Sequence, residues 1–258
     1  MLKIALTIAG SDPSGGAGIQ ADLKTFHRFG VYGEAVIALL TAQNTEGIQR
    51  VEVVPPDLVA EQILMVLADI PPHAAKIGAL GSVEVVKTVA RIAETFDFPL
   101  VVDTVMASKN GAPLLDRGAR TAVLDKLAPL AFLLTPNLDE AEALTSTRVR
   151  DLDGMARAAE KLVSAGAKNV LVKGGHLDGD PVDLLLASSG EYRQFGARRA
   201  ATRHTHGAGC TYSAAITAQL ALGQPLTEAI ACAKSFITEA IRRAAGLGRG
   251  AGPLNHFA

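Results

Sequence analysis

Residues 204–213 read HTHGAGCTYS, and an apolar run follows them directly from Ala214 to Leu222. This pattern predicts a glycine turn that leads into a helix, because Gly207 and Gly209 permit backbone conformations that other residues avoid. The first N–H groups of a helix have no partner within the helix, and the helix dipole is positive there. The stretch therefore predicts an anion site, for which phosphate is the usual ligand.

Cys210 lies in the first turn of this predicted helix. A thiol in that position can have a lowered pKa, which favours the thiolate. We interpret Cys210 as a candidate base beside the anion site. The alternative is a small buried cysteine that only packs in the core, and these ten residues favour neither interpretation over the other. Cys232, in the last predicted helix, is expected to pack in the core.

The composition bounds the class of protein. The chain has 258 residues, of which 48% are apolar and 20% are charged, and its net charge is −1. We expect one large α/β domain over residues 1–258. The absence of a basic run argues against nucleic acid or an anionic membrane as a partner.

The apolar start of the chain is too short to span a membrane and favours a buried first strand over a signal peptide. Two cysteines fit a reducing cytoplasm and give no paired-cysteine metal site.

Strand-like apolar runs alternate with segments of helical period. Strands are predicted at Ile4–Ala9, Ala35–Thr41, Ala74–Leu80, Leu100–Asp103, Phe132–Thr135, Asn169–Lys173, Val182–Ala187 and Tyr192–Phe195. Helices are predicted at Ala17–Phe29, Asp57–Asp69, Val83–Thr95, Arg117–Leu127, Leu138–Leu144, Asp151–Ala165, Gly209–Leu222 and Leu226–Ala245. Continuous apolar strands in such an alternation indicate a mainly parallel sheet with helices on both sides. Ligands bind beyond the carboxyl ends of the strands in these sheets.

The first strand ends in a glycine-rich turn, GSDPSGGAG at residues 10–18. So many small residues suggest a ligand that touches the backbone, although a plain tight turn is the alternative. Residues 16–21 match the dinucleotide pattern G-x-G-x-x-G/A in form. However, the acidic residue expected about 20 positions later is missing, and no Walker loop occurs. A dinucleotide oxidoreductase therefore remains only a weak rival.

Polar side chains follow the other strands. The Gln43 amide offers a donor and an acceptor, which suits the edge of a heterocycle. Asp103, alone at the end of an apolar strand, is a candidate magnesium ligand. Asn137 and Glu140 either face a metal–phosphate site or only support the start of a helix. Lys173 supplies positive charge at a strand end.

Five motifs occur in order along nearly the whole chain. They are AGSDPSGGAGIQAD at 9–22, TAQNT at 41–45, TPN at 135–137 with Glu140, VKGGH at 172–176 and HTHGAGCT at 204–211. Each motif alone is weak, but the five in register are specific. Together they resemble the hydroxymethylpyrimidine/phosphomethylpyrimidine kinases of thiamine biosynthesis, which belong to the ribokinase-like superfamily.

The resemblance implies a ribokinase-like three-layer αβα sandwich with a mainly parallel central sheet and antiparallel edge strands. It implies a homodimer that uses ATP and Mg²⁺, and the cysteine content places it in the cytoplasm. The implied reaction is phosphorylation of 4-amino-5-hydroxymethyl-2-methylpyrimidine and then of its monophosphate to the diphosphate.

The resemblance also implies roles for individual residues. Cys210, Gly207 and Gly209 would be catalytic, with Cys210 as the base where most of the superfamily has aspartate. Asp103 and Glu140 would lie near the metal. The substrate would contact Gly10, Asp22, Gln43, Leu80 and Val105, and ATP would contact Thr135, Asn137, Lys173 and Ala208.

Some residues depart from the family's usual pattern. Thr104 stands in place of a proline, Leu80 in place of a methionine against the pyrimidine, Ala208 in place of a threonine and Asn110 in place of a serine. Ala208 keeps the backbone N–H groups, so the anion site should survive. Lys109, in the same loop as Asn110, is either a phosphate contact or simply solvated.

Two further functions stay open at this point. Pyridoxal kinase activity is the nearest rival, because vitamin B6 also carries a hydroxymethyl group on an aromatic nitrogen ring. A non-catalytic regulator that binds thiamine precursors is a rival from another class.

Overall fold

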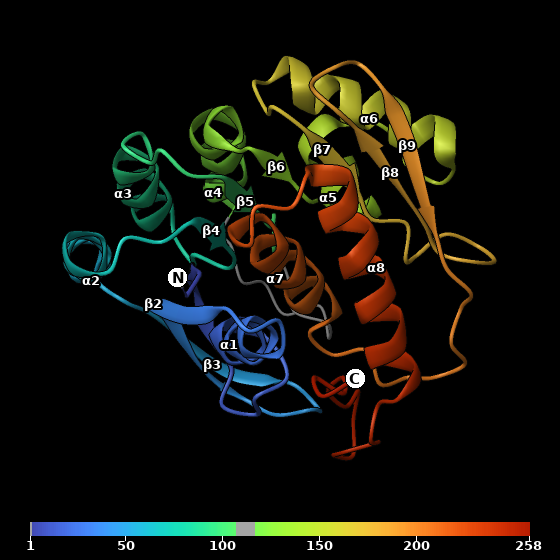
Figure 1. Ribbon diagram of the computed structural model, residues 1–258, viewed down its shortest axis with the longest axis horizontal. Helices are drawn as coiled ribbons and strands as arrows, with labels where there is room; N and C mark the ends of the chain where they lie inside the picture. The colour runs from blue at the N-terminus through green and yellow to red at the C-terminus, as the bar shows by residue number, and fades with distance from the viewer. Residues whose placement is uncertain (1, 107–116) are drawn as a thin grey trace.

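The fold is built on one sheet of nine strands, seen in a computed structural model that describes residues 2–106 and 117–258 (Figure 1). The strand order is β3-β2-β1-β4-β5-β6-β7-β8-β9. The bounds are β1 Ile4–Ser11, β2 Tyr32–Gln43, β3 Ile48–Val53, β4 Ala74–Ile77, β5 Leu100–Val102, β6 Leu133–Leu134, β7 Val170–Val172, β8 Val182–Leu186 and β9 Tyr192–Gly196. The central strands β2, β1, β4, β5, β6 and β7 pair in parallel, whereas β3, β8 and β9 are antiparallel. The predicted mainly parallel sheet with antiparallel edges is confirmed.

Helices cover both faces of this sheet, which gives the three-layer sandwich (Figure 1). One face carries α2 Pro56–Asp69, α3 Val83–Ala93, α4 Arg117–Ala122, α5 Leu138–Thr145 and α6 Leu152–Ser164; the other carries α1 Gly18–Arg28, α7 Ala208–Ala221 and α8 Leu226–Arg242. None of the helices described is both long enough and apolar enough to cross a membrane.

Two apolar cores lie on the two faces of the sheet, because successive side chains of a strand point to opposite sides. In β5, Val101 packs with the α1–α7–α8 core while its neighbour Val102 packs with the α2–α6 core. Helix α7 is enclosed, since every side chain from Thr211 to Ala221 is buried. A helix that is apolar all round belongs in such a core, and its burial fixes the position of its N-terminus.

The structure corrects several predicted boundaries. The edge strand β3 was not predicted, and the predicted strand Ala74–Leu80 ends at Ile77. The predicted helix over Arg117–Leu127 is α-helical only to Ala122 and continues as a π-helical turn. Residues 107–116, which include Lys109 and Asn110, lie outside the described part of the chain.

Candidate active site

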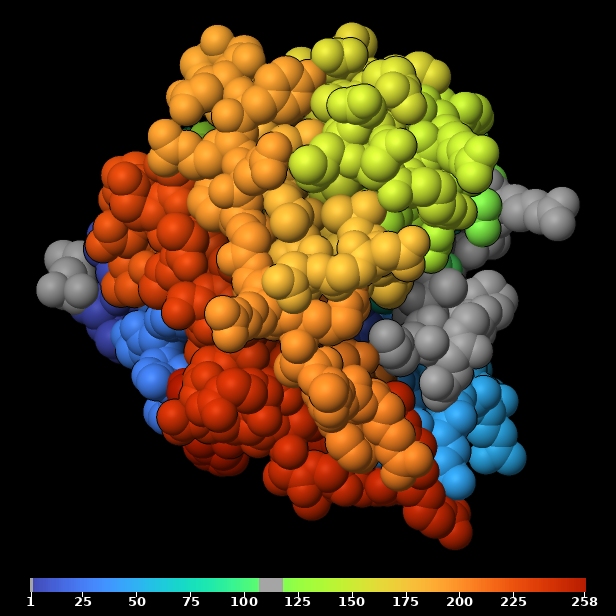
Figure 2. Space-filling view, turned by 90° about the vertical axis from the view of Figure 1, so that its right-hand side faces the viewer, coloured from blue at the N-terminus to red at the C-terminus, as the bar shows by residue number. Residues whose placement is uncertain are grey.

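A cavity of about 820 Å³ opens at the carboxyl edge of the parallel strands. A cavity of this size is typical of small-molecule and cofactor sites. Eleven of the predicted site residues line it: Gly10, Gln43, Asp103, Val105, Asn137, Glu140, Lys173, Gly207, Ala208, Gly209 and Cys210. The segment 198–206 also contributes to its wall, and Figure 2 shows this segment (orange) beside the carboxy-terminal residues (red) on one face of the molecule.

An ion pair between Asp103 and Lys173 lies at the ends of β5 and β7. Lys173 Nζ is 2.7 Å from Asp103 Oδ1, and Ser213 Oγ of α7 donates to Asp103 Oδ2 at 3.0 Å. Burial alone would raise the pKa of the Asp103 carboxyl, but Lys173 and Lys76 outweigh it and lower that pKa. Asp103 is therefore ionised, with its side chain facing the cavity beside a fixed positive charge.

Asn137 and Glu140 form a capping box at the start of α5. Asn137 Oδ1 accepts from Glu140 N at 2.9 Å, and Glu140 Oε2 accepts from Asn137 N at 2.8 Å. Thr104, the residue that replaces a proline, donates its hydroxyl to Glu140 Oε2 at 3.0 Å. Burial raises the pKa of Glu140 to about 7, despite the nearby Lys173. The predicted support of the helix start is therefore confirmed, and because both residues also line the cavity, their contact with a metal–phosphate group stays a prediction.

The glycine turn before α7 has the geometry that the sequence predicts. Gly207 is left-handed, with φ of 78°, and a Cβ at this position would run into the carbonyl oxygen of Gly16. Among the described residues, the Ala208 N–H bonds to the Thr205 carbonyl, while no hydrogen bond uses the N–H of Gly209 or Cys210. A Cβ on Gly209 would lie 3.5 Å from Lys173 Nζ, so the first turn of α7 lies beside the ammonium.

The Cys210 thiol contradicts the predicted lowered pKa. Burial raises the pKa of Cys210 to about 11, which outweighs the positive charge of Lys76 and a hydrogen bond from the Gly18 N–H. The helix N-terminus alone therefore does not produce a thiolate here. At pH 7, therefore, roughly one Cys210 side chain in ten thousand is a thiolate. Cys232, expected in the core, is exposed on α8.

Alkylation should report this raised pKa directly. In a Cys232→Ala background, we expect the rate at which iodoacetamide modifies Cys210 to rise about tenfold per pH unit from pH 7 to 10, because only the thiolate reacts. Mass spectrometry of the peptide that contains Cys210 gives the rate. A rate that levels off near pH 8 would mean that the thiol pKa is not raised.

Three predicted contact residues do not line the large cavity. Asp22, predicted to bind substrate, is fully buried, and its carboxylate lies 2.7 Å from Lys76 Nζ and 2.7 Å from Thr7 Oγ1. Thr135, predicted to bind ATP, is fully buried and donates to Asp103 Oδ1 at 3.2 Å. Both side chains lie beneath the cavity wall, where they are hydrogen-bonded to buried charged groups.

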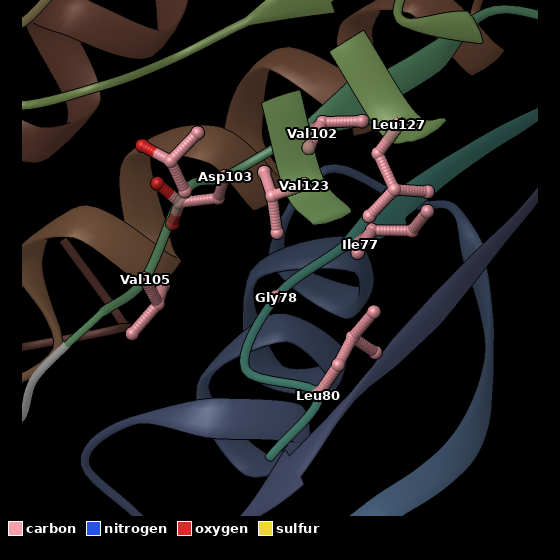
Figure 3. A pocket seen from close by; sticks show the side chains of 9 residues that line it. Ile77, Gly78, Leu80, Val102, Asp103, Val105, Val123 and Leu127 are labelled. Carbon is pink, nitrogen blue, oxygen red and sulfur yellow. The ribbon is translucent and has the colours of Figure 1, made fainter. Parts of the chain in front are cut away.

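Leu80, the third, is only 1% exposed and lies in a separate, smaller hollow beside the large cavity. Figure 3 shows this hollow, with Leu80 and Ile77 along one side and Asp103 near Val105 at the other. Val105 lines both spaces. Leu80 therefore packs behind the wall of the large cavity.

Two functional candidates were missed. His206 lies within the motif HTHGAGCT at residues 204–211, and its Nε2 is 2.8 Å from Asp12 Oδ2 in the first glycine-rich turn. Both side chains are nearly buried and both line the large cavity. The two residues are 194 positions apart, so only their presence in two separate motifs could have suggested the contact.

Two acidic side chains of the cavity, Asp103 and Glu140, are the candidate ligands for magnesium. The described residues contain no cluster of three or more histidine, cysteine or acidic side chains that could hold a metal by themselves. Magnesium is usually held by one or two carboxylates together with phosphate oxygens and waters. Asp103 and Glu140, which both line the cavity, fit that pattern.

A parallel sheet whose carboxyl edge carries a glycine turn, a lysine and two acids defines the ribokinase-like class of small-molecule kinases. The family model described as phosphomethylpyrimidine kinase matches residues 12–255. The chain belongs to this phosphomethylpyrimidine kinase family.

Named relatives agree with the family assignment. The chain is 46% identical to the hydroxymethylpyrimidine/phosphomethylpyrimidine kinase of Haemophilus influenzae, over 100% of this chain and 97% of the relative. It is 51% identical to the thiamine biosynthesis bifunctional protein ThiED of Geobacter sulfurreducens, over 98% of this chain, and spans about half, 52%, of that relative. Among solved structures, the pyridoxal kinase of Staphylococcus aureus in complex with AMP-PCP and pyridoxal superposes with a TM-score of 0.91 at 35% identity, covering 100% of this chain and 95% of that one.

Proposed function

We propose that this kinase transfers the γ-phosphoryl group of ATP to the hydroxymethyl oxygen of 4-amino-5-hydroxymethyl-2-methylpyrimidine, and then phosphorylates the monophosphate to the diphosphate. One observation carries the proposal. Lys173, Gly209 and Cys210 line one cavity together with Gln43, Gly209 lies beside the Lys173 ammonium, and no hydrogen bond among the described residues uses the N–H groups of Gly209 and Cys210. The site thus combines an anion cradle with a group able to read a heterocycle.

The residues act mainly by alignment and charge compensation, which is most of what phosphoryl transfer requires from a protein. Lys173 and Asn137 hold the phosphates of ATP. The N–H groups of Gly209 and Cys210 stabilise the negative charge that develops on the transferred group. Cys210 accepts the proton of the attacking alcohol, and its raised pKa makes the thiolate a strong base that is rare at neutral pH.

Asp103 and Glu140 would hold Mg²⁺ together with phosphate oxygens. When bound, the ion neutralises phosphate charge and orients the leaving group. Thr104 and Ser213 keep the two carboxylates in place through their hydroxyl hydrogen bonds.

Phosphate transfer from ATP to the hydroxymethylpyrimidine, followed for both successive products, tests the proposal. We expect both products to form in sequence. ATP-dependent turnover would exclude a non-catalytic regulator, and the absence of nicotinamide dinucleotide binding would exclude an oxidoreductase.

Pyridoxal kinase activity is a second candidate, favoured by the close superposition on a pyridoxal kinase. Sequence identity is higher to the named hydroxymethylpyrimidine kinase, 46% against 35%. A side-by-side assay with pyridoxal and the hydroxymethylpyrimidine separates the two activities.

We also propose that the chain works as a single kinase domain over residues 1–258, as a homodimer in the cytoplasm. Leu40, Leu64 and Met65 are large apolar side chains exposed to 48%, 55% and 72%, which suits burial against a second copy. Both cysteines are free, which suits a reducing compartment. Sedimentation of the purified protein would test the dimer.

Gly207→Ala should distort the turn before α7 and so disrupt the proposed anion site at the N–H groups of Gly209 and Cys210. An added methyl group would meet the Gly16 carbonyl, and the left-handed backbone disfavours any side chain. We expect kcat for both transfers to fall by about 10²–10³, comparable to the loss of one anion-hole donor. Gly223→Ala is the matched control, because Gly223 is also left-handed, at φ of 85°, but stands in open space at the far end of α7. Equal losses in both variants would contradict the role of the turn.

A further inference from the structure

The side-chain amide of Gln43 lies between two polar groups, Thr41 and His206, in the wall of the cavity. Its Oε1 is 3.2 Å from Thr41 Oγ1, and its Nε2 is 3.4 Å from His206 Nε2. His206 Nε2 is also 2.8 Å from Asp12 Oδ2. The orientation of this amide depends on which of these neighbours donate hydrogen and which accept it.

The Asp12 carboxylate is held from several directions. Its Oδ1 accepts from the N–H and the hydroxyl of Ser14 at 2.8 and 2.7 Å, and its Oδ2 accepts from the Ala17 N–H at 2.9 Å. Burial alone would raise the pKa of Asp12, but the hydrogen bonds from His206 and Ser14 lower it. Asp12 is therefore an ionised group that only accepts hydrogen bonds, and the close contact requires a proton on His206 Nε2.

A protonated His206 Nε2 cannot accept a hydrogen bond from an amide NH₂ group. Its single hydrogen already bonds to Asp12, so an NH₂ group beside it would set two donors against each other, whereas the carbonyl oxygen of Gln43 would not. At the other end of the amide, Thr41 Oγ1 lies 3.0 Å from the Ser11 carbonyl oxygen, which can only accept. The Thr41 hydroxyl therefore donates to Ser11 and accepts from the Gln43 NH₂ group. Both neighbours therefore favour an amide rotated by 180°, with its oxygen towards His206 and its NH₂ group towards Thr41. This rotation only exchanges the positions of the amide oxygen and nitrogen, which are similar in size.

We propose that the Asp12–His206 pair determines ring specificity by fixing the orientation of the Gln43 amide. The fixed amide keeps one N–H and one oxygen lone pair free for the ligand, in a set order along the cavity wall. That order suits a ring that presents an acceptor nitrogen beside an exocyclic amino group, as an aminopyrimidine does. A hydroxypyridine ring lacks this adjacent pair. Asp12 and His206 are thus positioning residues, and the proposal rests on the proposed function of the site.

The test is the selectivity of His206→Phe, measured as the ratio of Kd values for the hydroxymethylpyrimidine and pyridoxine. Pyridoxine is chosen because it has no aldehyde that could react with lysine or cysteine. Phenylalanine fills the space but donates no hydrogen, so Thr41 alone is left to orient the amide. We expect the preference for the aminopyrimidine to fall about tenfold, the value of one correctly placed hydrogen bond. In turnover the loss should appear in KM with kcat nearly unchanged, because the ring does not react.

Two further variants separate positioning from a general structural effect. His206→Gln restores an N–H donor and should recover most of the selectivity. His204→Phe is the matched control. His204 lies two residues before His206, and its Nδ1 accepts from the Gly252 N–H at 3.1 Å, but it does not line the cavity. His204→Phe should keep the wild-type ratio.

An unchanged Kd ratio in His206→Phe, or an equal loss for both rings, would overturn the inference, as would a wild type that binds neither ring. A wild-type protein that binds the pyrimidine selectively without turning it over would overturn the proposed function alone. The Kd ratio of His206→Phe would then still decide the role of the pair.

Discussion

Replacing Cys210 with alanine is expected to slow transfer to the pyrimidine alcohol by about 10²–10⁴-fold, the usual contribution of a general base. Transfer to the monophosphate should slow by less than about tenfold, because a phosphate with a second pKa near 6 is already ionised at pH 7 and needs no base. Separate assays that start from the alcohol and from the monophosphate measure the two steps. A similar loss in both would contradict the role of Cys210 as a base.

Two comparisons separate loss of the base from damage to the cavity. Cys210→Ser replaces the thiol with a hydroxyl of similar size. A hydroxyl is a much weaker acid than a thiol, so almost no alkoxide forms at neutral pH to act as the base, and this variant should resemble alanine. Cys232→Ala removes the exposed thiol of α8 and should leave both steps unchanged.

The pH profile of the wild type adds an independent check on this role. Since the pKa of Cys210 is raised to about 11, the thiolate fraction and the first transfer should both rise with pH throughout the neutral range. Glu140, with a pKa of about 7, titrates in the same range and acts on both transfers, so the second transfer should level off once Glu140 is ionised while the first continues to rise.

The sequence predicted the central sheet well because its buried strands are continuous apolar runs. Strand β3 was missed for the opposite reason. Polar side chains interrupt its apolar residues Ile48, Val51 and Val53, and every side chain of the strand is half-buried or exposed, as expected at the edge of a sheet. The position of a residue at a strand end was also predictable, since strand ends follow from the apolar pattern.

The direction of each side chain was less predictable. Thr135 ends a parallel strand as Asp103 does, but it turns inward to donate to the Asp103 carboxylate. Asp22 lies one turn into α1, where the helix packs on the sheet instead of facing the cavity. The pKa of Cys210 was predicted in the wrong direction because the local pattern shows the helix dipole but not the burial imposed by distant segments.

Asp22→Ala should destabilise the fold by about 3–5 kcal/mol, the usual cost of removing one partner of a buried ion pair. Lys76 and Asp22 are both 0% exposed, and Asp22 accepts two contacts from Lys76 Nζ, at 2.7 and 2.8 Å. Burial alone would lower the pKa of Lys76, but the Asp22 carboxylate raises it, so the ammonium stays charged. Without Asp22 this charge is left in a space with no water to solvate it. Urea unfolding followed by circular dichroism measures the loss.

The double variant Asp22→Leu with Lys76→Met distinguishes an orphaned charge from a simple packing defect. Apolar replacement of a whole buried pair is often neutral, so the double variant should recover most of the stability that Asp22→Ala loses. A double variant as unstable as the single one would show that shape and not charge sets the cost. Because Lys76 also acts electrostatically on Asp103 and Cys210, a stable double variant should still be a poorer kinase. Recovered stability with reduced turnover would therefore place the pair beneath the site as an electrostatic support, in agreement with its position away from the cavity wall.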